Sequence, residues 1–246
     1  MFLQILTYAL VIVINLTVGW ILIQRGRRQD ALPELLLGAS LTLDGLEWLF
    51  WVLAIETPAM GTPLADLLAT ASRVGVAGHN ICLLFFTWFV FRRESRAALG
   101  VAFVASLVAT VSLLVGTALG DWMGYRSDRI WIWLEVGTLH VAYAWALAES
   151  TLHYARMRRR LAHGLGDPVV TNRMLLWAAY AGTSLCSQLA YTTSIGVATF
   201  AGEYPFFLDV LMSVPSCFAA LALWLAFFPP QAYKRWLASG VRGTAS

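Results

Sequence analysis

Seven apolar stretches, each about 20 residues or longer, divide this chain and constrain its fold more than any other feature. Each can cross roughly 30 Å of hydrocarbon as a helix. Only 13% of the residues are charged, whereas a soluble domain carries about a quarter. The short alternating strands of a membrane barrel are missing from the pattern. We therefore expect an all-α membrane protein, a seven-transmembrane-helix bundle within residues 1–228. The stretches lie near 3–24, 31–55, 65–91, 97–119, 130–155, 172–196 and 205–228.

Basic residues between these stretches predict the orientation of the bundle. Lys and Arg are enriched in the cytoplasmic loops of membrane proteins. One side of the predicted bundle carries 14 of the 17 Lys and Arg residues, and the other carries only Arg126 and Arg129. This bias predicts an N-terminus outside the membrane and a C-terminus inside. The 14 residues are Arg25, Arg27, Arg28, Arg92, Arg93, Arg96, Arg156, Arg158, Arg159, Arg160, Arg173, Lys234, Arg235 and Arg242.

The net charge of +3 is explained by these topology-determining residues, so it does not indicate a nucleic-acid partner. Some of the basic side chains are expected to contact anionic membrane lipid. Residues 229–246 follow the last stretch and place Lys234 and Arg235 beside Tyr233 and Trp236. This mixture predicts a short amphipathic helix on the inner membrane surface.

The beginning of the chain and its cysteines indicate neither a signal peptide nor a metal site. The first ten residues, MFLQILTYAL, lack a basic segment and a small-residue cleavage site, so we expect the first transmembrane helix here. Cys82, Cys186 and Cys217 all lie within apolar stretches, which suits buried thiols. No CxxC or HExxH motif occurs, so no metal ligands are assigned.

Two carboxylates lie inside the second apolar stretch, in the segment LTLDGLEWLF. A charged side chain at the centre of a bilayer costs about 2.5–3.5 kcal/mol, so such residues face the bundle interior and find partners there. Ser40, Asp44, Glu47 and Trp51 are spaced so that they share one helix face. We therefore expect this face to point inward, with Trp51 and the neighbouring Trp48 deep enough to line a cavity.

Arg73 of the third stretch is the expected counter-charge. Glu47 and Arg73 each lie roughly 12–13 Å from the outer ends of their stretches, which predicts an ion pair between them. Glu135 and His140 are five residues apart, so at most one of them is expected to face Asp44 squarely. The polar residues of five stretches together predict a cavity that opens outward. Its predicted ligand-binding or relay residues are Asp44, Glu47, Arg73, His79, Asn80, Glu135, His140, Gln188, Tyr191 and Asp209.

Several functions fit such a cavity. The first is binding or sensing of a small ligand, with the signal passed to a cytoplasmic partner at the Arg156–Arg160 loop and the tail. The alternative is a small transporter or proton-coupled carrier, because histidine and buried carboxylates can exchange protons. The same residues can also form a purely structural network. An enzyme is the least favoured class, because an intramembrane hydrolase usually needs three clustered metal ligands and the four histidines are scattered.

The residues of the chain bear on two cofactors, haem and retinal. His79 and His140 are candidate axial ligands for haem, although they lack the doubled histidine pattern of membrane haem proteins. The segment FLDVLMSV, residues 207–214, is similar to the last helix of microbial rhodopsins, where a lysine bears retinal. Ser213 occupies that place here, and the one lysine of the chain, Lys234, lies in the tail. A retinal Schiff base is therefore excluded.

A second resemblance covers more of the chain. The segments LPELLLGASL (32–41), LLFFTWFVFRRESRAALG (83–100) and LAFFPPQAYKRW (225–236) resemble a family of uncharacterised bacterial seven-helix membrane proteins. All three lie on the predicted cytoplasmic side. The resemblance implies a shared fold and a place in the bacterial inner membrane, with several membrane passes. It implies no activity and no catalytic residue.

Overall fold

The computed structural model describes residues 2–55, 62–120, 129–201 and 206–242, and most of these residues are helical. Each predicted apolar stretch lies in one of the first seven helices, except that residues 31 and 228 fall just outside a helix and residue 205 lies outside the described residues, so the all-α prediction is confirmed. The eight helices of the described residues are α1 (Phe2–Gln29), α2 (Leu32–Ile55), α3 (Pro63–Phe91), α4 (Arg96–Leu119), α5 (Ile130–Ala162), α6 (Pro168–Ala201), α7 (Phe206–Phe227) and α8 (Gln231–Arg242).

Six of these helices, α1 to α5 and α7, are long and apolar enough to cross a membrane, which indicates a multi-pass membrane protein. Helix α6 is longer, at 34 residues, but it is not one of the six. Its middle carries hydroxyl and amide side chains, among them Ser184, Ser187 and Gln188, which lower its hydropathy. These polar side chains face the centre of the bundle.

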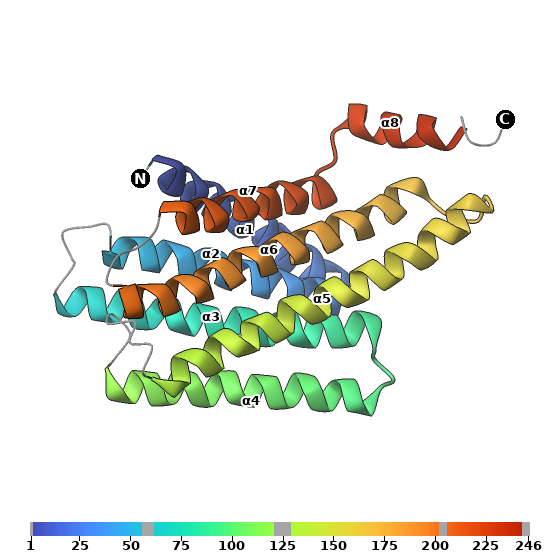
Figure 1. The fold of residues 1–246 in the computed structure, drawn as a ribbon. Coiled ribbons are helices and arrows are strands. Elements are labelled where there is room, and N and C mark those ends of the chain that lie inside the picture. The colour runs from blue at the N-terminus through green and yellow to red at the C-terminus, as the bar shows by residue number, and fades with distance from the viewer. Residues whose placement is uncertain (1, 56–61, 121–128, 202–205, 243–246) are drawn as a thin grey trace.

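Contacts between helices close a ring around the centre of the bundle. Neighbours in this ring are α1 and α2, α2 and α3, α3 and α5, α5 and α6, α6 and α7, and finally α7 and α1. Helix α4 lies outside the ring and packs on α3 and α5 (Figure 1). The side chains at the centre therefore come from the six ring helices.

Close approach of glycines fixes how α1, α2 and α3 pack. A Cβ atom added to Gly38 of α2 would lie 2.8 Å from the Gly19 carbonyl oxygen of α1, and one added to Gly19 would lie 2.5 Å from Thr42 Oγ1. A Cβ atom on Gly75 of α3 would lie 3.0 Å from Cβ of Glu47. Because only glycine permits such approach, these three helices form one tight unit. The same packing fixes the rotation of α2 about its axis.

Capping residues set the ends of α4 and α6. Ser95 Oγ accepts a hydrogen bond from the Ala98 amide (3.2 Å) at the start of α4, and Asp167 Oδ1 accepts one from the Val169 amide (2.7 Å) at the start of α6. Helix α4 ends at Gly120, whose φ of 66° is a left-handed conformation that favours glycine. These caps fix the register with which α4 and α6 pack.

The two ends of the bundle differ. The connections from α3 to α4 and from α5 to α6 lie at one end together with α8, and the N-terminus lies at the other (Figure 1). Basic residues end α1 and α5 and begin α4, all at the end that carries α8. Arg129 precedes α5 at the opposite end, while Arg126 lies outside the described residues. Helix α8 packs on α6, where Asn172 Nδ2 donates to the Tyr233 hydroxyl at 2.8 Å.

Candidate functional site

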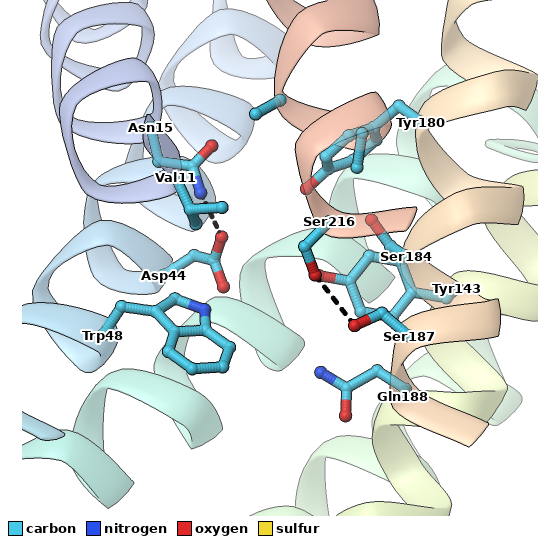
Figure 2. Close-up of a pocket in the computed structure, with 12 residues that line it drawn as sticks. Val11, Asn15, Asp44, Trp48, Tyr143, Tyr180, Ser184, Ser187, Gln188 and Ser216 are labelled. Atoms are coloured by element: carbon cyan, nitrogen blue, oxygen red, sulfur yellow. Dashed lines mark hydrogen bonds between the residues drawn. The ribbon is translucent and has the colours of Figure 1, made fainter. Parts of the chain in front are cut away.

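A polar cavity lies at the centre of the ring (Figure 2). Its volume is about 40 Å³, which is room for roughly three water molecules. Five helices supply its walls, and α6 contributes the hydroxyl and amide side chains that lower its own hydropathy. Asp44, Gln188 and Trp48 line it, as the sequence predicts. The lining residues are Val11, Asn15, Asp44, Trp48, Tyr143, Tyr180, Ser184, Ser187, Gln188, Ser216, Ala219 and Ala220.

Asp44 is the one carboxylate among these lining residues, and no Lys, Arg or His is among them. Asn15 Nδ2 on α1 donates a hydrogen bond to Asp44 Oδ2. The other carboxylate oxygen points into the cavity (Figure 2). Asp44 is only 8% exposed, so its carboxylate has little contact with outside solvent. The cavity is thus acidic on the wall formed by α1 and α2.

Hydroxyl groups of α6 and α7 form the opposite wall. Ser187 Oγ and Ser216 Oγ lie 2.8 Å apart, and each also lies near the Met212 carbonyl oxygen, at 2.9 and 2.8 Å, so that one serine donates to the other and the second donates to Met212. The two hydroxyl protons are used within this triangle, so the serine oxygens offer lone pairs to the cavity. Asn15 Oδ1 and Gln188 Oε1 are buried as well and have no hydrogen-bond partner in the described residues.

His79 lies behind Asp44 and does not line the cavity. Its Nδ1 lies 3.0 Å from Ser40 Oγ and 3.1 Å from the Ser40 carbonyl oxygen. Its Nε2 lies 3.0 Å from the Tyr143 hydroxyl oxygen. The ring is close enough to Asp44 to act on it electrostatically. His79 therefore links α2, α3 and α5 by hydrogen bonds.

A buried ion pair lies nearer the end of the bundle opposite α8. Arg73 Nη1 is 3.4 Å from Glu135 Oε2, and the guanidinium lies 5.1 Å from the centroid of the Trp51 ring. The predicted Glu47–Arg73 ion pair is wrong, because α5 packs directly on α3 and brings Glu135 to Arg73. Glu47 remains near enough to act on Arg73 through its charge, and Tyr191 is also beside the guanidinium.

The structure decides which of Glu135 and His140 faces inward. Glu135 is 3% exposed and bonds to Arg73, whereas His140 is half-buried between α5 and α6. His140 Nδ1 lies 2.7 Å from the Val136 carbonyl oxygen, and its Nε2 lies 3.3 Å from the Thr192 hydroxyl. The two residues thus serve different helix contacts, and neither lines the cavity.

The remaining residues of the predicted set are dispersed. Asn80 Nδ2 donates to the Thr138 hydroxyl at 2.7 Å, which joins α3 to α5 away from the cavity. Asp209 is in the first turn of α7, apart from the cavity, and its Oδ1 has no hydrogen-bond partner within the described residues. The structure therefore separates the ten residues into a cavity, an ion pair with its neighbours, and isolated contacts.

A second ion pair joins α3 and α5 at the end that carries α8. Arg92 Nε donates to Glu149 Oε1 at 2.6 Å, and Trp145 Nε1 donates to the same oxygen at 3.3 Å. The hydrogen bond and charge of Glu149 raise the pKa of Arg92 above its ordinary value. The side chain of Arg92 is 44% exposed, so water screens this pair far more than the Arg73–Glu135 pair.

Three polar residues of the cavity were not predicted from the sequence: Asn15, Tyr143 and Tyr180. A signal existed for Asn15, because it is an amide in the middle of an otherwise apolar helix, where polar side chains face the interior. The tyrosines carried no comparable signal, since tyrosine is as frequent at membrane interfaces as in cavities.

The described residues do not form a site for a metal ion or for haem. No three His, Cys, Asp or Glu side chains there cluster closely enough to hold a metal ion. Both ring nitrogens of His79 are within hydrogen-bonding distance of protein atoms, so axial ligation of haem would require these contacts to break.

Comparison with known proteins identifies no relative. No family model, no curated protein and no solved structure matches the chain. The resemblance to uncharacterised bacterial seven-helix proteins therefore stays a prediction. The function is inferred from the site itself.

Proposed function

We propose that the chain is a seven-helix protein of the bacterial inner membrane, with its N-terminus outside and its C-terminus inside. Helix α6 is the proposed seventh span, because it lies between α5 and α7 in the ring and is long enough to cross the bilayer. Its polar side chains line the cavity, away from lipid. The orientation is supported by the basic residues gathered at the end that carries α8.

The proposed function is the binding and sensing of a small solute in the central cavity. The observation that carries this proposal is the position of Asp44, a buried carboxylate with one oxygen directed into the cavity between five helices. An ionisable group at membrane depth is expensive, and it marks a ligand or ion site by default. A cavity of about 40 Å³ limits the solute to a few non-hydrogen atoms.

Helices α6 and α7 offer a route from the cavity to the inner side. Pro215 interrupts the hydrogen bonding of α7 beside Ser216, a cavity residue, so α7 can bend at this point. Asn172 of α6 is hydrogen-bonded to Tyr233 of α8. A shift of these helices on solute binding would therefore move α8 relative to the Arg156–Arg160 segment, where we propose that a cytoplasmic partner binds.

A proton-coupled carrier is the second candidate, and the ion pair near the outer end favours it. Glu47 and Glu135 share the single guanidinium of Arg73 in a buried site. One carboxylate is thus in excess, and a proton would remove the surplus charge. A carrier predicts pH-driven solute flux in liposomes that Asp44→Asn abolishes. Flux equal to that of empty liposomes would leave sensing as the function.

Native mass spectrometry tests the binding proposal. The protein in mild detergent is incubated with the small-molecule fraction of a bacterial extract, as the wild type, Asp44→Asn and Asp66→Asn. Asp66 is an exposed carboxylate in the first turn of α3, so its variant is the matched control. We expect one small bound species on the wild type and on Asp66→Asn, and its loss in Asp44→Asn. No bound species on the wild type, or equal binding by all three, contradicts the proposal.

A further inference from the structure

We infer that the central cavity binds a small monovalent cation, either an alkali-metal ion or a small ammonium ion, against the Asp44 carboxylate. This inference rests on the proposed function and names the class of its solute. It follows from three properties of the cavity: its charge, the atoms that its walls present, and its size.

The charge of the cavity selects a cation. Asp44 lines it, and no Lys, Arg or His lines it to neutralise that carboxylate. His79 is close enough to act on Asp44 electrostatically, but the hydrogen-bond partners of its ring nitrogens are Ser40 and Tyr143 and not Asp44. An ionised Asp44 in this site is therefore one positive charge short of neutrality. A monovalent cation supplies that charge and removes the cost of a buried anion.

The walls present several oxygen atoms with free lone pairs. The bond from Asn15 Nδ2 to Asp44 fixes the orientation of that amide, so Asn15 Oδ1 is left without a partner in the described residues. Asn15 is 3% exposed, so water outside the protein does not satisfy this oxygen. Across the cavity, one of Ser187 and Ser216 donates to the other, and the second donates to the Met212 carbonyl oxygen. Carboxylate, amide and hydroxyl oxygens suit hard cations and ammonium donors.

Trp48 adds an aromatic surface beside the carboxylate. Its indole lies next to Asp44 at the edge of the cavity (Figure 2), and it stacks on Tyr8 of α1 with 5.3 Å between ring centroids. The stacking on Tyr8 holds the ring in place, so this surface is preorganised.

The volume of the cavity and its single carboxylate indicate a bound solute with one positive charge and few atoms. Divalent ions usually take several carboxylates, and one carboxylate with neutral oxygens balances a single positive charge. A volume of about 40 Å³ admits a bare alkali-metal ion with a water, an ammonium ion or methylammonium. Larger organic cations do not fit without separation of the helices.

Thermal unfolding in detergent at constant ionic strength tests this inference. The wild type is heated in N-methylglucamine chloride and in the chlorides of sodium, potassium, ammonium and methylammonium. We expect the unfolding temperature to rise saturably in at least one of the four small cations, relative to N-methylglucamine, which is too large for the cavity. The ranking of the four distinguishes a metal site from an ammonium site. Absence of any cation-specific rise in the wild type overturns the inference.

Variants assign the effect to the cavity. Asp44→Asn keeps the shape of the side chain but removes the charge, and we expect loss of the cation-specific rise with at least a tenfold weaker apparent affinity. Ser216→Ala is expected to weaken the affinity several-fold, and it serves if Asp44→Asn does not fold. Asp66→Asn should behave as the wild type. A cation-specific rise that persists unchanged in Asp44→Asn and Ser216→Ala contradicts the inference.

The inference and the proposed function fail separately. If the wild type shows no cation-specific rise while native mass spectra still show a neutral or anionic species that Asp44→Asn loses, the cavity binds a solute of another class. If both measurements show no binding that depends on Asp44, the proposed function fails with the inference.

Discussion

The contact between α1 and α2 and the contact between α3 and α5 hold the bundle together in opposite ways. In the first, glycines bring the two backbones together, so that an added Cβ on Gly38 would meet backbone atoms of α1 at 2.8 Å. In the second, long polar side chains reach across between the helices. These polar contacts are Arg73–Glu135, His79–Tyr143, Asn80–Thr138 and Arg92–Glu149.

This difference separates a rigid part of the molecule from a part that can move. Backbones in contact cannot slide or separate without losing their packing, and glycines extend such packing from α1 through α2 to α3. Side-chain pairs can separate and form again with new partners or with water. The cavity lies between α1 and α2 on one side and α5, α6 and α7 on the other. We therefore expect movement at the α3–α5 contact to open or close it.

The largest effect is expected from breaking the buried ion pair of the α3–α5 contact. Arg73→Met leaves Glu135 and Glu47 without a counter-charge, and loss of one partner of a buried pair costs about 3–5 kcal/mol. The double variant Arg73→Met/Glu135→Met removes both charges of the pair and should recover most of this loss. Unfolding temperatures in detergent measure both. If the double variant is no more stable than the single one, Arg73 and Glu135 do not act as a pair.

A smaller loss is expected from the glycine contact. Gly38→Ala places a Cβ 2.8 Å from backbone atoms, and overpacking of this kind costs about 1–3 kcal/mol. Gly137→Ala on α5 is the control, because a Cβ there meets no atom within 4 Å. Alanine is the better helix former by about 0.5–1 kcal/mol, so Gly137→Ala should be neutral or stabilising. Equal stability of the two variants would show that α1 and α2 are not in backbone contact.

The smallest effect is expected from Arg92, the exposed member of the α3–α5 contacts. Its pKa is raised by Glu149, so its share of stability is present below its unfolded pKa and is lost only as the pH rises through the higher folded value. The difference in unfolding temperature between the wild type and Arg92→Gln should therefore be small and the same at about pH 7 and pH 10. A difference that disappears by the higher pH contradicts this assignment.

The sequence predicted the helices well because spacing and hydropathy are local properties. The face shared by Ser40, Asp44, Glu47 and Trp51 does turn toward the bundle interior, as expected of polar residues at membrane depth. Glu47 also lies near Arg73, as the equal positions of the two residues along their helices predicted. Position along the helix alone could not predict which residue of a neighbouring helix pairs with Arg73.

The partners depend on the order of helices around the ring. No local property of the sequence indicates that α4 lies outside the ring and that α5 packs on α3. Because of this arrangement, the ion-pair partner of Arg73 is Glu135 and not Glu47. The glycine contact likewise brings Asn15 to Asp44, a bond between two helices that spacing along one helix cannot predict. Tertiary packing thus selected the site from a set of residues that the sequence had indicated in part.

The most direct test of the account is the ionisation state of Asp44. Infrared difference spectra of wild type minus Asp44→Asn, with Asp66→Asn as control, report the carboxyl group of this one residue. The account predicts the bands of an ionised carboxylate in the stabilising cation, and their decrease when N-methylglucamine replaces it. A protonated carboxylic acid band that persists unchanged in every salt would contradict the claim that Asp44 binds a cation in the central cavity.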